Sequence, residues 1–118
     1  MARILVIDDS KFARRRTADL LRSWGYEVLE AGDGQEGIGV IAGQQPDCVL
    51  TDLLMPEMDG YAVLERLREM NSPPPTFVLS ADIQIASKER CESLGAAGFI
   101  NKPYDPEELR ALLAGALS

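Results

Sequence analysis

The sequence predicts an α/β domain built on one parallel β-sheet. Five short apolar segments alternate with amphipathic segments, and the chain of 118 residues has the length of a single domain. Strands that alternate with helices need crossover connections, which make neighbouring strands parallel and cover both faces of the sheet. We therefore expect one domain over residues 1–118, with a single sheet between two layers of helices.

The first half of the chain supplies three of the expected strands, over residues 3–7, 27–31 and 48–53. Apolar residues recur at helical spacing after Ser10, whose hydroxyl suits a helix N-cap, and Gly25 ends that helix. The next helix is expected over residues 33–43. It contains Gly37 and Gly39, each of which weakens a helix by about 1 kcal/mol relative to alanine, so we expect it to be the least regular helix.

The second half supplies two more strands, over residues 76–80 and 98–101. Pro56 and Gly60 bracket an acidic loop, which is followed by a helix marked by Val63, Leu64, Leu67 and Met70. Three prolines at 73–75 cannot continue a helix. A helix over 83–94 precedes the fifth strand. The last helix has Pro106 at its first position, after a capping-box-like pair of Asp105 and Glu108.

Polar side chains follow four of the five expected strands. Asp8 and Asp9 follow the first strand, Asp52 lies at the end of the third, and Ser80 and Lys102 belong to the ends of the fourth and fifth. Sites in such sheets lie outside the carboxyl ends of the strands, so these side chains should meet at one edge. Three carboxylates would repel one another, and Mg²⁺ relieves this repulsion because it takes oxygen ligands and shares its shell with substrate phosphates. This set predicts phosphoryl transfer, with a carboxylate as the nucleophile.

Four motifs occur in order along the chain: VIDDS at 6–10, LTDLLMPEMDG at 50–60, LSA at 79–81 and FINKPY at 99–104. With them the chain resembles the response-regulator receiver domains of two-component systems over nearly its whole length. The resemblance implies a doubly wound, flavodoxin-like (βα)5 fold with strand order 2-1-3-4-5. It also implies a cytoplasmic phosphoprotein rather than an enzyme, limited to phosphoryl uptake and slow self-dephosphorylation.

The resemblance implies a role for each matching residue. Asp52 would be the phosphoacceptor, and a histidine kinase or histidine phosphotransfer protein would be the donor. Asp9 and Asp52 would ligate Mg²⁺ directly, Asp8 mainly through water, and Leu54 through its backbone carbonyl. Lys102 would pair with the phosphoryl group, with the Lys102–Pro103 bond held cis to aim the lysine.

Further residues are implied in switching. Ser80 would bond the phosphoryl group, and Phe99 would turn inward when Ser80 moves. The face formed by residues 83–117 would then change, and a downstream protein or a second copy of the domain would bind it. Leu54 and Asp82, two residues beyond Asp52 and Ser80, would tune the hydrolysis of the phosphoryl group.

Composition excludes several other kinds of site. The chain has no histidine, which removes histidine-based zinc sites, Ser-His-Asp triads and Cys-His dyads. A net charge of −7 argues against direct nucleic-acid binding, and no apolar run approaches the ~20 residues that span a bilayer. Cys48 and Cys91 have no metal-binding spacing, so we expect packing residues in a reducing compartment.

Two other functions use similar parts. An aspartyl-nucleophile phosphatase needs an acid or base two residues after the nucleophile, but Leu54 follows Asp52 and Ser10 follows Asp8 at that spacing. A flavodoxin-like cofactor binder needs a phosphate-cradling loop after the first strand, where two aspartates stand instead.

Two questions about the chain remain open from its sequence. The basic residues of the first helix suit either a solvated face or a docking surface for a kinase or phosphotransfer partner; they are Lys11, Arg14, Arg15, Arg16 and Arg22. Because the chain begins close to the first strand and ends with the last helix, we expect a stand-alone regulator. The alternative is a receiver excised from a longer regulator or hybrid kinase.

Overall fold

The computed structural model describes residues 2–81 and 84–117. Strands and helices alternate as β1 (Arg3–Ile7), α1 (Lys11–Ser23), β2 (Glu27–Ala31), α2 (Gly34–Gln44), β3 (Cys48–Asp52), α3 (Gly60–Arg68), β4 (Thr76–Ser80), α4 (Ile85–Ser93), β5 (Gly98–Asn101) and α5 (Pro106–Leu117). All strand pairs are parallel, in the order β2-β1-β3-β4-β5. This confirms the predicted doubly wound α/β fold.

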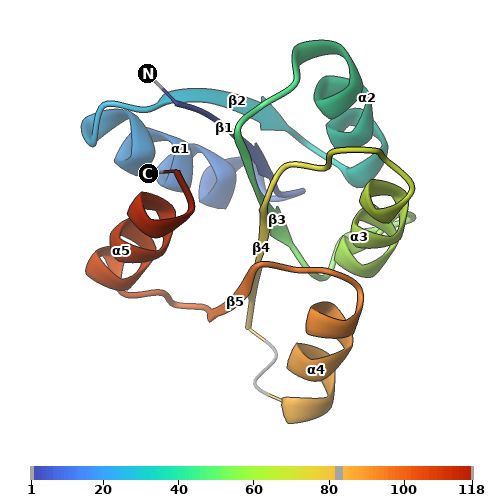
Figure 1. Ribbon diagram of the computed structural model, residues 1–118. Coiled ribbons are helices and arrows are strands. Elements are labelled where there is room, and N and C mark those ends of the chain that lie inside the picture. The colour runs from blue at the N-terminus through green and yellow to red at the C-terminus, as the bar shows by residue number, and fades with distance from the viewer. Residues whose placement is uncertain (1, 82–83, 118) are drawn as a thin grey trace.

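Helices cover both faces of the sheet (Figure 1). On one face, α1 and α5 bury Leu21 and Leu109 against strand residues such as Leu50. On the other face, α2 and α3 pack on β1 and β3, and α3 and α4 enclose a smaller cluster that contains Val78 and Cys91. The central strands are therefore buried on both sides, which explains why they read as continuous apolar runs.

Helix ends follow the capping residues that the sequence indicates. The Ser10 hydroxyl accepts a hydrogen bond from the Ala13 amide at the start of α1, as expected. Gly25 has a φ of 94° beyond the end of α1, a conformation that glycine adopts without strain. At α5, Pro106 occupies the first position and the Asp105 carboxylate accepts from the Glu107 amide.

Several predicted boundaries are wrong by one or more residues, including those of the helix expected over 33–43, which spans Gly34–Gln44. β3 ends at Asp52 rather than at residue 53. α3 ends at Arg68 instead of reaching Met70, because the amides of residues 69 and 70 donate to carbonyls three residues back, which tightens and closes the last turn. The helix expected over 83–94 begins at Ile85 and ends at Ser93, and Ile83 lies outside the described residues.

The expected irregularity of α2 is also absent. The helix is continuous from Gly34 to Gln44, and the Asp33 carboxylate caps its start by accepting from the Glu36 amide. Gly37 is buried against Ile7 of β1, where a side chain would collide with the isoleucine. The close packing at Gly37 therefore offsets its poor helix propensity.

Two further predictions concern the cysteines and membrane-spanning segments. Cys48 and Cys91 are both buried in the core, as expected for packing residues. Among the helices of the described part of the chain, none combines the length and apolar character needed to cross a bilayer.

Candidate functional site

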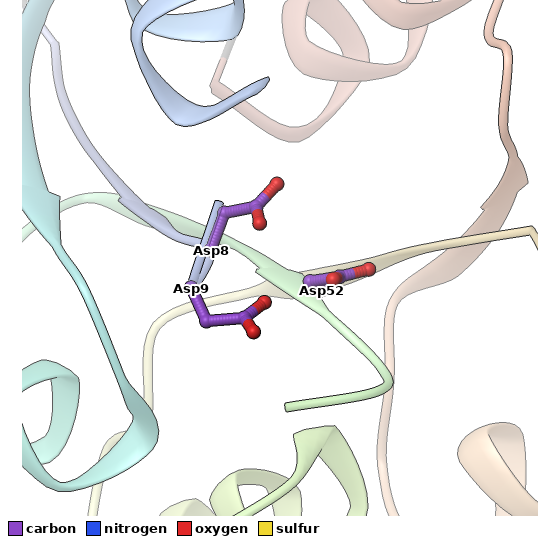
Figure 2. Close-up of side chains that lie close together, drawn as sticks. All are labelled: Asp8, Asp9 and Asp52. Atoms are coloured by element: carbon purple, nitrogen blue, oxygen red, sulfur yellow. The ribbon is translucent and has the colours of Figure 1, made fainter. Parts of the chain in front are cut away.

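Three carboxylates meet at the carboxyl edge of the sheet. Figure 2 shows the side chains of Asp8 and Asp9, which follow β1, beside that of Asp52 at the end of β3. One oxygen atom from each carboxylate lies within 4.8 Å of the others. The adjacency of β1 and β3 in the sheet brings Asp52 beside the acid pair, although more than forty positions separate Asp52 from Asp9 in sequence.

Asp8 is the buried member of this cluster. Its Oδ1 accepts a hydrogen bond from the Ser10 amide at 2.9 Å, and its Oδ2 accepts from Lys102 Nζ at 3.2 Å. Asp9 is exposed to solvent. The pair therefore offers one fixed carboxylate and one that is open to ligands.

Asp52 lies between the acid pair and Lys102. Its Oδ1 is 3.3 Å from Lys102 Nζ and accepts from the Leu53 amide at 3.1 Å. No hydrogen bond reaches Oδ2 from the described residues. Burial raises the pKa of Asp52, and the nearby Asp8 charge adds to this, while Lys102 partly offsets both.

Lys102 is fixed by the backbone that carries it. The Lys102–Pro103 peptide bond is cis, as the resemblance implies, and the Lys102 amide donates to the Ser80 carbonyl at 2.7 Å. Burial alone would lower the pKa of Lys102, but the carboxylates of Asp52 and Asp8 outweigh it and raise that pKa. The lysine therefore remains a cation within reach of both carboxylates.

This donor set fits a hard divalent cation. Carboxylate oxygens are the ligands that Mg²⁺ prefers. Asp8, Asp9 and Asp52 each offer one such oxygen, and these oxygens lie within 4.8 Å of one another, so the three residues would together hold the ion.

Ser80 and Phe99 lie on the same face of the sheet. Phe99 is paired with Val78 in the register of β4 and β5, and Ser80 follows Val78 by two residues, so its side chain points to the same side as that of Val78. Phe99 packs, half-buried, against the cluster that α3 and α4 enclose. Ser80 is buried at the end of β4. The two residues are thus diagonal neighbours beneath α4.

Leu54 and Asp82 are the remaining two predicted site residues. The Leu54 side chain is 65% exposed, in the loop that follows Asp52. Asp82 lies outside the described residues.

Gly60 and Arg14 contribute to the geometry of the site, although the sequence analysis did not identify either of them as doing so. A Cβ on Gly60 would lie 2.8 Å from the Asp52 carbonyl oxygen, so only glycine lets α3 begin against the end of β3. Arg14, which the sequence grouped with an exposed basic face, is largely buried and donates to the Asp8 carbonyl. The signal for Gly60 is its place directly after the Asp59 cap, whereas no local pattern marks Arg14.

Comparison with known proteins places this geometry in a family. The family model of the response regulator receiver domain matches residues 4–114. The chain is 37% identical over 115 residues to the probable transcriptional regulator ycf27 of Porphyridium aerugineum, covering 98% of this chain and 48% of that protein. It is 36% identical over 111 residues to the sensor histidine kinase RcsC of Salmonella typhi, covering 94% and 12%. The chain thus spans about half, or less, of the length of these curated relatives.

Solved structures agree with the family match. The chemotaxis protein CheY4 of Vibrio cholerae superposes with a TM-score of 0.90 at 30% identity, covering 99% of both chains. A response regulator receiver domain protein from Clostridium thermocellum gives a TM-score of 0.93 at 26% identity, covering 99% of this chain and 94% of that one. The chain therefore belongs to the response regulator receiver domain family of two-component systems.

Proposed function

We propose that this domain accepts a phosphoryl group on Asp52, in the presence of Mg²⁺, from a histidine kinase or a histidine phosphotransfer protein in the cytoplasm. The observation that carries the proposal is the position of the Asp52 carboxylate, between the acid pair and an ammonium group 3.3 Å away. A nucleophile, a metal-binding acid pair and a fixed cation are the parts that phosphoryl transfer requires.

The proposed reaction is a displacement at phosphorus. A carboxylate oxygen of Asp52 attacks the phosphorus atom, an O–P bond forms, and the P–N bond of the donor phosphohistidine breaks, with the electron pair going to the imidazole. Oδ2 suits this role because Oδ1 is already engaged by Lys102 and the Leu53 amide. Burial raises the pKa of Asp52, and the Lys102 charge acts in the opposite direction by favouring the carboxylate form.

The other site residues act around this step. Asp9 and Asp52, with the Leu54 carbonyl, would hold Mg²⁺ directly and Asp8 would do so through water. The ion neutralises the charge of the transferred group when bound. Lys102 would exchange its contacts with Asp8 and Asp52 for a phosphoryl oxygen, and the Ser80 hydroxyl would donate to another. Leu54 and Asp82 would tune hydrolysis: the apolar Leu54 side chain offers no group that orients water, whereas Asp82 carries a carboxylate that could.

The phosphoacceptor assignment is tested with acetyl phosphate and Mg²⁺. The wild-type protein should gain one phosphoryl group by intact mass, and base should remove it. Asp52→Asn should gain none, because an amide is not a nucleophile here. Asp47→Asn is the matched control, since Asp47 is an exposed residue that precedes β3 at the opposite edge of the sheet, and an asparagine oxygen can still accept from the Arg3 amide. Full labelling of Asp52→Asn would refute the assignment.

The donor protein is proposed to dock on α1. Phe12 is 75% exposed there, and Lys11, Arg15 and Arg16 are exposed basic residues on an acidic protein. A groove of about 490 Å³ between α1 and the segment from Lys102 to Pro106 lies next to the site. Charge complementarity would attract an acidic partner to this surface. Arg16→Glu should slow transfer from a phosphorylated histidine phosphotransfer protein and leave the reaction with acetyl phosphate unchanged.

We also propose that the domain works as a single-domain regulator through protein contacts. The alternative is a receiver within a longer protein, since this chain spans only 48% of the ycf27 relative and 12% of RcsC. Immunoblotting of the native protein tests the idea. A band near 12.9 kDa is expected, and a much larger protein would contradict it.

A further inference from the structure

Arg14 of α1 connects the acid pair to β2. Its Nη1 donates a hydrogen bond to the backbone carbonyl of Asp8 at 2.8 Å, and its Nε donates to Glu30 Oε1 at 3.2 Å. Its side chain is only 15% exposed. A residue with these contacts is held inside the fold, unlike its exposed neighbour Arg15.

The other end of this connection is firmly anchored. Glu30 is 16% exposed and also pairs with Arg15 Nε and Arg22 Nη2, each at 3.3 Å. A guanidinium group is a rigid planar fork, so fixing Nε on Glu30 also fixes the direction of Nη1.

The Asp8 carbonyl controls the orientation of both acid residues. It belongs to the peptide group between Asp8 and Asp9, and that group is planar up to the Cα atom of Asp9. The Asp8 amide is already held by the Ala31 carbonyl at 3.1 Å, as the last bond of the β1–β2 ladder. Holding the carbonyl as well therefore sets the direction in which the chain carries Asp9 away from β1.

We propose that Arg14 is a positioning residue for the metal site: it fixes the Asp8–Asp9 peptide and thereby aims the two carboxylates. The proposal rests on the Mg²⁺ site of the proposed function, but Arg14 touches neither the carboxylate oxygens of the acid pair nor Asp52. Groups that orient metal ligands in this way commonly affect metal affinity by ten- to a hundredfold.

The direction in which Mg²⁺ affinity changes when Arg14 is removed distinguishes a positioning role from a purely electrostatic one. Removing a cation close to a Mg²⁺ site should strengthen Mg²⁺ binding, because one repulsive charge is lost. Loss of positioning should weaken it, because the carboxylates no longer point into one site. Arg15 provides the matched control, since it pairs with the same Glu30 but makes no contact with Asp8.

The experiment measures Mg²⁺ dissociation constants by amide NMR titration of the unphosphorylated protein. Arg14→Ala should bind Mg²⁺ roughly tenfold more weakly, the lower end of the range for residues that orient metal ligands. Arg14→Lys should be intermediate, because lysine can donate to the Asp8 carbonyl but cannot bridge to Glu30. Arg15→Ala should bind as the wild type does or slightly more tightly. With acetyl phosphate, Arg14→Ala should need more Mg²⁺ for half-maximal labelling, yet approach the wild-type rate at saturation.

Other results would overturn the inference. Unchanged or tighter Mg²⁺ binding by Arg14→Ala, with or without a lower melting temperature, would leave Arg14 a purely structural residue. If Arg14→Ala does not fold, the Mg²⁺ affinities of Arg14→Lys and Glu30→Gln provide the test. Wild-type Mg²⁺ affinity in both variants would reject the positioning role. A wild-type protein that binds no Mg²⁺, or an Asp9→Ala variant that binds it undiminished, would instead refute the proposed metal site itself.

Discussion

Three guanidinium groups converge on Glu30, which gives the protein a pH-dependent stabilising contact. Burial raises the pKa of Glu30, but the hydrogen bonds from Arg14 and Arg22 and the charge of Arg15 outweigh it and lower that pKa overall. A lowered acid pKa stabilises the fold above the ordinary glutamate range, and the stabilisation is lost as pH falls through the lowered pKa.

Glu30→Gln should therefore reduce the free energy of unfolding by about 1–2 kcal/mol at pH 7, and the difference from wild type should fade towards pH 3. Urea unfolding at both pH values measures this. Glu27→Gln is the control, because Glu27 is 52% exposed and pairs with Arg3 rather than with the guanidinium groups around Glu30. A deficit that is the same at both pH values would contradict the linkage.

The hydroxyls of Tyr104 and Thr17 form a second contact whose energy can be measured. They lie 3.0 Å apart and join the segment after Lys102–Pro103 to α1. Tyr104→Phe should cost about 1 kcal/mol, since the largely buried Thr17 hydroxyl loses its partner. A double-mutant cycle with Thr17→Val should give a coupling of similar size, and additive effects would show that the bond contributes nothing.

At the scale of the residue, the sequence predicts which side chains meet at the carboxyl edge of the sheet, but it does not predict the position of Arg14. Asp8, Asp52 and Lys102 follow strands of one parallel sheet, so the fold rule alone brings them together. Arg14 could not be found in this way. Whether a basic residue on a helix points to solvent or to a neighbouring strand depends on where β2 lies, and helical spacing does not contain that information.

At the scale of the element, alanine substitutions at two glycines of α2 should change stability in opposite directions. Gly37 is buried, and an added Cβ would lie 2.9 Å from Ile7 Cγ1 and closer still to Cδ1, whereas Gly39 is exposed with nothing within 4 Å. Gly39→Ala should stabilise the protein by up to about 1 kcal/mol, because alanine is the better helix former. Gly37→Ala should destabilise it through overpacking, typically by about 1–3 kcal/mol. Thermal unfolding compares the two variants, and equal effects would contradict the packing difference.

The sequence predicts which helices and strands form, but it does not predict where several of them end. Apolar periodicity extends to Met70, yet that side chain is 38% exposed and lies beyond α3. The helix ends where backbone hydrogen bonds shift to three-residue spacing, and side-chain patterns do not record this. Likewise Ile85 is 73% exposed at the start of α4, so one apolar residue does not identify a buried face.

Across the whole molecule, the helices differ in how firmly they are anchored. α3 and α4 have nine residues each, but α3 buries four of them while α4 buries only Ser87 and Cys91. Helix stability in proteins comes mainly from such burial, and elements with little of it open or shift first. α4 lies next to β5, whose Phe99 packs in the same cluster as Cys91. A change near Ser80 would therefore reach α4 more readily than α3.

The last prediction follows from this difference. Beryllofluoride with Mg²⁺ mimics an acyl phosphate on Asp52, and it should favour a packing in which Ser80 moves toward Asp52 and Phe99 turns inward. A ligand shifts an equilibrium only by its unequal affinity for two packings, so the weakly anchored α4 should respond together with β5 next to it and with α5, which follows β5 in the chain. Amide NMR spectra with and without beryllofluoride should show shifts across residues 84–117, in addition to those near the three aspartates. Asp52→Asn should show neither set. Shifts confined to the surroundings of Asp8, Asp9 and Asp52 would reject the switch and leave the phosphoacceptor assignment standing.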